Sequence, residues 1–170
     1  NDLSGSADDV AKRTKALLAA EQVTIAEAGF VFDRYFCRVD ILRKNGDEIE
    51  LIEVKAKSWS SKSVGTVKKR EFLTGKGAVE SGIRDYVYDV AFQKYVVCEA
   101  LKALFPDRQF KVKAALMMAD KGKVADCPRV NQYFKIEQKH DRPQIIRMPG
   151  AEQLKEREHL LTPFWEVDAI

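Results

Sequence analysis

Cysteine, glycine and proline are all scarce in this sequence. The 170 residues include three Cys, nine Gly and five Pro. The cysteines, Cys37, Cys98 and Cys127, are odd in number, widely spaced and never form a Cys-x-x-Cys pair. A disulfide framework, a zinc ribbon and a four-cysteine iron–sulfur site are therefore excluded, and the low glycine and proline content excludes collagen-like and low-complexity classes. We interpret the cysteines as core residues of a protein in a reducing compartment, which predicts a cytoplasmic location.

Long apolar runs are missing as well. A charged residue interrupts every stretch that approaches the ~18 residues of a membrane-spanning helix, which excludes a membrane protein. No signal peptide is expected in the residues given, and the opening residue, Asn1, fits a domain excised from a longer chain with further domains. The content of 45% hydrophobic and 32% charged residues predicts one globular domain, 1–170, with a core that needs no disulfide or structural metal.

A strong excess of one charge is also lacking. The chain carries 29 Lys and Arg against 26 Asp and Glu, a net charge of +3. Basic residues nevertheless gather in segment 55–76, where Glu71 is the only acid. Two interpretations of this segment remain open: it holds phosphate groups, or it is a solvated loop whose lysines keep the protein in solution.

The spacing of apolar residues predicts a mixed α/β or α+β domain. Helices are expected at 8–20, 84–104 and 151–161, the last of them on the surface. Strands are expected at 23–30, 35–42, 49–56, 109–119 and 133–138. Asn45-Gly46 is the strongest turn signal and predicts that the second and third strands form an antiparallel hairpin. The Ser-, Lys- and Gly-rich residues 57–82 predict a loop, with a short helical piece at 68–73.

Three charged residues of the predicted hairpin form the candidate site. Asp40 and Glu53 stand on neighbouring strands where their carboxylates can converge, and Lys55 shares a strand face with Glu53. Burying ionised groups in an apolar run such as 51–56 costs free energy, because they lose their hydration, unless they are paired or bound to a metal. Two carboxylates suit Mg²⁺ or Mn²⁺, and a neighbouring lysine could activate water and offset the charge of a phosphoryl transition state. The alternative is a simple Glu53–Lys55 ion pair on an exposed strand.

Asp40, followed after twelve residues by Glu53-Val54-Lys55, resembles the motif of the PD-(D/E)xK nuclease superfamily. The resemblance covers 8–119 and implies a restriction-endonuclease-like αβββαβ core, with 120–170 as an extension that adds a strand and a helix. It implies that Asp40, Glu53 and the backbone carbonyl of Val54 bind Mg²⁺ or Mn²⁺, and that Lys55 assists the attacking water. Val39 stands where the superfamily has the proline of its name.

The stretch 88–95 is similar to the RecB-like branch of this superfamily, whose members carry a Gln and a Tyr on the helix after the Glu-x-Lys strand. Gln93 fits this position, which implies that it orients the water or Lys55, and a polar amide is unexpected on the apolar stripe where it lies. The other interpretation of Gln93 is an amide hydrogen-bonded within the core. Tyr95 follows too closely to match the branch, and no His precedes Asp40. Glu27 is a candidate to replace that His as a metal ligand, against the alternative of a surface carboxylate.

The basic segment is the candidate contact for nucleic acid. Trp59 could stack on an unpaired base or pack the loop against the sheet. No zinc finger or helix-turn-helix pattern is present. The sequence therefore predicts a metal-dependent nuclease, with DNA favoured over RNA, and its alternative is a catalytically silent module of the same fold that binds nucleic acid or a protein. The predicted nucleic-acid contacts are Lys57, Trp59, Lys62, Lys68, Lys69 and Arg70.

Overall fold

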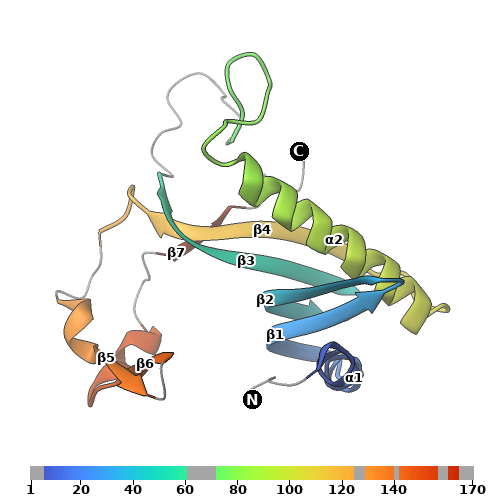
Figure 1. Cartoon of the computed structure of the whole chain (residues 1–170), viewed down its shortest axis with the longest axis horizontal. Helices are drawn as coiled ribbons and strands as arrows, with labels where there is room; N and C mark the ends of the chain where they lie inside the picture. The colour runs from blue at the N-terminus through green and yellow to red at the C-terminus, as the bar shows by residue number, and fades with distance from the viewer. Residues whose placement is uncertain (1–5, 61–71, 125–128, 140–141, 157–160, 165–170) are drawn as a thin grey trace.

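The structure is a computed structural model of the chain, and it describes residues 6–60, 72–124, 129–139, 142–156 and 161–164. Within these residues, two α-helices and seven strands follow one another in the order helix, three strands, helix, four strands, and Figure 1 shows their arrangement. These are α1 (Ala7–Leu17), β1 (Gln22–Phe32), β2 (Tyr35–Asn45), β3 (Glu48–Trp59), α2 (Arg84–Leu104), β4 (Lys111–Asp120), β5 (Phe134–Lys139), β6 (Arg142–Arg147) and β7 (Leu161–Phe164). Two short 3₁₀ helices, η2 (Val130–Tyr133) and η3 (Ala151–Glu156), flank the β5–β6 hairpin.

The main sheet is mixed, with strand order β1-β2-β3-β4-β7. β1, β2 and β3 are antiparallel neighbours, whereas β4 runs parallel to β3 and β7 antiparallel to β4. Helix α2 crosses the sheet from β1 to β4, and α1 packs on the other side of β1 (Figure 1). This arrangement confirms the predicted class, a mixed sheet with helices in an α+β domain, and the predicted order of the elements up to β4.

Helix α1 begins with a side-chain cap and docks through a close contact. The hydroxyl of Ser6 accepts a hydrogen bond from the Asp9 backbone N–H. Acidic residues in the first turn interact favourably with the positive end of the helix dipole. A Cβ atom at Gly29 of β1 would lie 2.5 Å from Val10 Cγ1, so the absence of a side chain lets α1 approach the strand. The helix ends at Leu17, three residues before the predicted end.

The predicted β2–β3 hairpin is confirmed. Asn45 pairs with Glu48, so the two turn residues are Gly46 and Asp47, one position later than the dipeptide Asn45-Gly46 indicated. Gly46 has a φ of +59°, a conformation that favours glycine. The tight turn fixes the register that decides which residues of β2 and β3 face one another.

Helix α2 begins and ends at the predicted residues and carries the apolar stripe that was expected. Its buried side chains follow helical spacing, and Gln93 is the only polar residue among them, with 5% of its surface exposed. This buried amide is therefore held in the layer between α2 and the sheet, directly over β3.

Three predictions for the loops and the C-terminal part are wrong. β3 continues to Trp59, so Lys57 and Trp59 lie on a strand and the loop begins later than expected. Phe72 has a φ of +65° and Leu73 forms a β-bridge with Val79, so the described end of the expected helical piece at 68–73 is not helical. The predicted surface helix at 151–161 is replaced by the 3₁₀ helix η3 and by β7, because β7 pairs with the open edge of β4.

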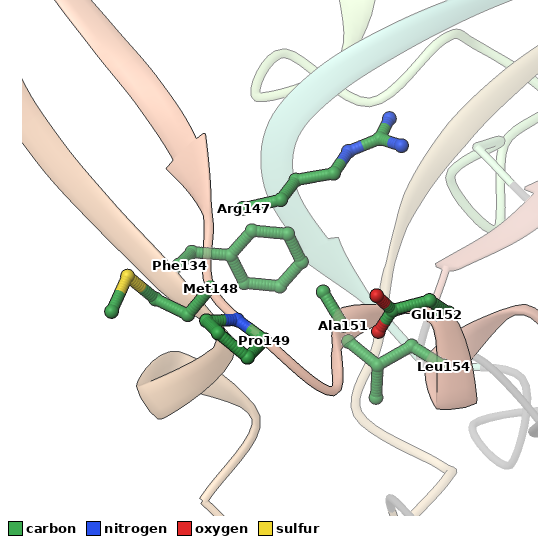
Figure 2. A pocket seen from close by; sticks show the side chains of 7 residues that line it. All are labelled: Phe134, Arg147, Met148, Pro149, Ala151, Glu152 and Leu154. Atoms are coloured by element: carbon green, nitrogen blue, oxygen red, sulfur yellow. The ribbon is translucent and has the colours of Figure 1, made fainter.

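The β5–β6 hairpin forms a sheet of its own beside the main one (Figure 1). Where β6 leads into η3, side chains surround a surface pocket, with the ring of Phe134 and the side chain of Glu152 on its walls (Figure 2). Glu152 is the one carboxylate among the residues that line this pocket, which therefore does not have the donors of the predicted metal site. No helix in the described residues is long and apolar enough to span a bilayer.

Candidate functional site

Strands β2 and β3 part at the position of Asp40. Their paired residues end at Ile41 opposite Ile52, and the next step in this register would place Asp40 opposite Glu53. The Asp40 carboxylate instead accepts a hydrogen bond from the Val54 backbone N–H, with 2.8 Å between Oδ2 and N. A side chain thus replaces the ladder hydrogen bond where the strands diverge, and it brings the half-buried Asp40 carboxylate to the peptide bond that follows Glu53.

Glu53 and Lys55 share one strand face, as the strand alternation predicted, and both contact side chains of α2. Only 9% of the Glu53 side chain and 21% of the Lys55 side chain are exposed, and Lys55 Nζ lies 2.7 Å from Glu53 Oε1. The pair is therefore not the simple ion pair on an exposed strand that was the alternative interpretation. A carboxylate this deeply buried needs the ammonium group and further hydrogen bonds to offset its lost hydration.

Two residues of α2 complete the network around this pair. Asp89 Oδ2 lies 2.7 Å from Lys55 Nζ. The Gln93 amide nitrogen donates to Glu53 Oε2 at 2.9 Å and to Asp89 Oδ1 at 3.2 Å. Each of the four side chains thus contacts two others in a closed cycle, and we call Glu53, Lys55, Asp89 and Gln93 the polar ring.

Both interpretations of Gln93 find support in its contacts. Its amide is buried and hydrogen-bonded within the core, and its partner is a carboxylate of the candidate site. The Gln93 side-chain oxygen Oε1 is buried and accepts no hydrogen bond within the described protein atoms. An unpaired buried acceptor costs about 1–3 kcal/mol, so this oxygen is suited to hold a water molecule or another donor next to the ring.

The ring fixes the charge of Lys55. Burial is the largest single influence on its pKa and lowers it, but the hydrogen bonds and charges of Asp89 and Glu53 outweigh burial and raise the pKa above its usual value. Lys55 is therefore a cation at neutral pH. Nearby, burial first and the charges of Asp89 and Glu53 second raise the pKa of the Cys37 thiol to about 12, so that Cys37 stays protonated.

Three other predicted residues, Glu27, Lys57 and Trp59, make their contacts outside the polar ring. Glu27 pairs with Arg38 at 3.8 Å, and half of its side chain is exposed. Lys57 Nζ donates to the Gly82 carbonyl at 2.5 Å. The Trp59 ring packs against Phe72 with 5.1 Å between ring centroids, which supports the packing interpretation of this tryptophan.

The remaining predicted nucleic-acid contacts fall outside the described residues. These are Lys62, Lys68, Lys69 and Arg70. Among the described residues, Lys55 and Lys57 both lie against the aromatic ring of Tyr86, with their Nζ atoms 5.5 Å and 5.6 Å from its centroid.

The residues that could hold a divalent cation are Asp40, Glu53 and the Val54 carbonyl. Within the described chain no group of three or more His, Cys, Asp or Glu side chains could hold a metal ion. Mg²⁺ nevertheless needs only one or two carboxylates when water and substrate phosphate complete its shell. The donors present are hard oxygens. Glu53 Oε1 accepts a hydrogen bond from Lys55 and Oε2 accepts one from Gln93, and each oxygen retains a further lone pair, so the donor set fits Mg²⁺ or Mn²⁺.

Asp89 is the site residue that sequence reasoning missed. It precedes Gln93 by four residues on a helix, a spacing that places the two side chains on one side. A carboxylate one turn before an unexpected buried amide was the signal that could have identified it. The function of the chain is inferred from its own residues, because comparisons with protein-family models, with curated proteins and with solved structures gave no match.

Proposed function

We propose that the protein is a metal-dependent nuclease that hydrolyses phosphodiester bonds, with DNA as the favoured substrate. The observation that carries the proposal is the position of the Asp40 carboxylate, 2.8 Å from the Val54 N–H and beside the buried Glu53–Lys55 pair. Asp on β2, Glu-x-Lys on β3 and Gln on the following helix, within the order helix, three strands, helix, strand, support the resemblance to PD-(D/E)xK nucleases.

In this proposal Asp40, Glu53 and the Val54 carbonyl hold Mg²⁺ or Mn²⁺. The bound cation would polarise the scissile phosphate and lower the pKa of a water molecule. Lys55 acts as a fixed positive charge that stabilises the negative charge developing on the phosphate, because its raised pKa keeps it protonated. Gln93 holds the Glu53 carboxylate through its amide nitrogen and thereby orients it.

A cleavage assay tests this proposal. The protein is incubated with linear, circular and single-stranded DNA, and with RNA, in the presence of Mg²⁺, Mn²⁺ or EDTA. Cleavage is expected with metal only, and Asp40→Asn and Lys55→Met are expected to abolish it. Asp47→Asn and Lys102→Met make the same chemical changes at exposed ion pairs away from the ring and should cleave like the wild type. Cleavage that survives EDTA or Asp40→Asn would refute the proposal.

One observation favours the second candidate function, a silent module of this fold that binds nucleic acid or a protein. Glu53 and Asp89 already receive hydrogen bonds on all four carboxylate oxygens, from Lys55 and Gln93, so the ring is closed by the protein alone. DNA binding that persists with no cleavage under either metal would favour this module over the nuclease.

A further inference from the structure

Helix α2 carries a row of exposed aromatic side chains on the surface next to the polar ring. Tyr88, Phe92 and Tyr95 are 61%, 41% and 52% exposed. They lie four and three residues apart, a spacing that places them on one side of the helix. They are also the only exposed large apolar side chains of α2, which is described over its whole length.

The β1–β2 turn extends this row. Phe32 meets Tyr95 edge to face at 6.2 Å between ring centroids, and Tyr35 meets Phe92 in the same way at 5.8 Å. The guanidinium carbon of Arg34 lies 5.4 Å from the centre of the Tyr35 ring. We call this patch the aromatic surface, and it consists of Phe32, Arg34, Tyr35, Tyr88, Phe92 and Tyr95.

The aromatic surface borders the polar ring along the same two turns of α2. Tyr88 directly precedes Asp89, and Phe92 directly precedes Gln93. Asp89 and Phe92 are three positions apart in the sequence, which places them about 60° apart around the helix axis. The row therefore adjoins the polar ring at Asp89, 39% of whose side chain is exposed.

The composition of the surface indicates which ligand it fits. Arg34 is the only cation among its six residues, so the surface offers aromatic rings and few contacts for phosphates. Duplex bases are stacked on one another, so an aromatic ring reaches their faces only by unstacking a base step, at a cost of about a few kcal/mol. Unpaired bases offer free π-faces, and stacking on aromatic rings is the usual way in which proteins hold them.

We propose that the aromatic surface binds the unpaired bases of a single strand, and that the neighbouring site acts on single-stranded nucleic acid. The choice of substrate rests on the proposed nuclease function. The binding itself does not, because it needs neither the metal nor the polar ring.

The test is a binding titration in EDTA, where no metal-dependent cleavage occurs. Fluorescein-labelled oligo(dT) and a hairpin duplex are titrated with the full chain, and fluorescence anisotropy gives Kd for each. Tyr88→Leu and Tyr95→Leu remove the π-face and keep an apolar side chain, whereas Tyr88→Phe and Tyr95→Phe keep the ring. Phe134→Leu is the matched control, since Phe134 is 39% exposed and lies on the separate β5–β6 hairpin (Figure 1).

Each Leu variant is expected to raise Kd for oligo(dT) by roughly 5-fold to 100-fold, while the Phe variants and Phe134→Leu bind like the wild type. The salt dependence of Kd should be the same in all of them, because stacking involves no phosphate contact. Thermal melting checks that each variant is folded.

Several results would overturn the inference. The inference is refuted if the wild type does not bind oligo(dT), or if the Leu variants bind it as tightly as the wild type does. It is also refuted if the Leu variants lose as much affinity for the duplex as for oligo(dT). A change of oligomeric state in the Leu variants, with DNA binding unchanged, would instead assign the surface to a protein partner. Ring-dependent binding by a protein that cleaves nothing would leave this inference intact and refute the nuclease proposal alone.

Discussion

The buried Glu53–Lys55 pair allows a quantitative prediction for the polar ring. Lys55→Met keeps most of the length of the side chain but removes the ammonium group, which leaves Glu53 with the Gln93 amide as its remaining partner in the ring. Breaking a fully buried ion pair costs about 3–5 kcal/mol, and an exposed pair contributes about 0–1 kcal/mol. Because 21% of the Lys55 side chain is exposed, we expect an intermediate loss of about 2 kcal/mol in the free energy of unfolding.

A double-mutant cycle separates the pair from its surroundings. Glu53→Gln alone leaves Lys55 paired with Asp89, so its cost should be smaller than that of Lys55→Met. In the double variant neither charge remains unpaired at this position, and the coupling energy should be about 1–2 kcal/mol. Urea unfolding followed by circular dichroism gives the four free energies.

The exposed pair of Glu48 and Lys111 is the control for this cycle. Their charged atoms are 3.6 Å apart, and 56% and 70% of the two side chains are exposed. The corresponding cycle should give a coupling of about 0–0.5 kcal/mol. Equal coupling energies in the two cycles would show that burial does not strengthen the Glu53–Lys55 pair, and the reasoning about the ring would then be refuted.

Three further predictions concern the scaffold around the ring. Gly29→Ala should destabilise the fold by about 1–3 kcal/mol in urea unfolding, because its Cβ would meet Val10, whereas Gly75→Ala, with open space around it, should be nearly neutral. Lys44→Met should lower stability by about 1–2 kcal/mol, since the buried ammonium donates to two backbone carbonyls after α1, and an unchanged urea midpoint would contradict this. Burial raises the pKa of Cys37 from its usual 9.0 to about 12. The protonated thiol therefore contributes its full share to the free energy of unfolding below pH 9.0, and this stabilisation is lost as the pH rises toward 12. Urea midpoints measured across this range should therefore fall more steeply for the wild type than for Cys37→Ala, and parallel curves would contradict the shift.

Local signals explain the parts of the fold that the sequence predicted. The Asn45-Gly46 dipeptide limits the hairpin to a tight turn, and the turn fixes the β2–β3 register within one residue. The apolar spacing of α2 identifies both the helix and the polar exception at Gln93, because a helical face is decided by residues three and four positions apart.

Long-range contacts explain the parts that could not be predicted. β7 is a strand because the edge of β4 offers hydrogen bonds to it. The residues before β7 favour a helix, and nothing in the local sequence indicates that β4 is available as a partner. The parting of β2 and β3 at Asp40 depends on a side chain that reaches a backbone N–H on the neighbouring strand. Regular alternation assigned Asp40 to a strand face and could not indicate this contact.

The buried charges of the polar ring point to a role beyond stabilising the fold. Replacing a buried ion pair by apolar side chains of similar size is often neutral or stabilising, so stability alone does not account for a Glu and a Lys in the apolar strand β3.

The charges of the polar ring do not cancel. The Lys55 ammonium pairs with two carboxylates, those of Glu53 and Asp89, at 2.7 Å from each. One ammonium between two carboxylates leaves a net negative charge, and Asp40 adds a further carboxylate at the adjoining peptide bond. A negative, partly buried group of oxygens is the environment that attracts a divalent cation, and no other residue of the ring supplies a positive charge to neutralise it. A substitution of Asp40 to Asn should therefore weaken Mn²⁺ binding in isothermal titration calorimetry while leaving the ring and its stability intact, and equal Mn²⁺ affinity in this variant would separate Asp40 from the cation.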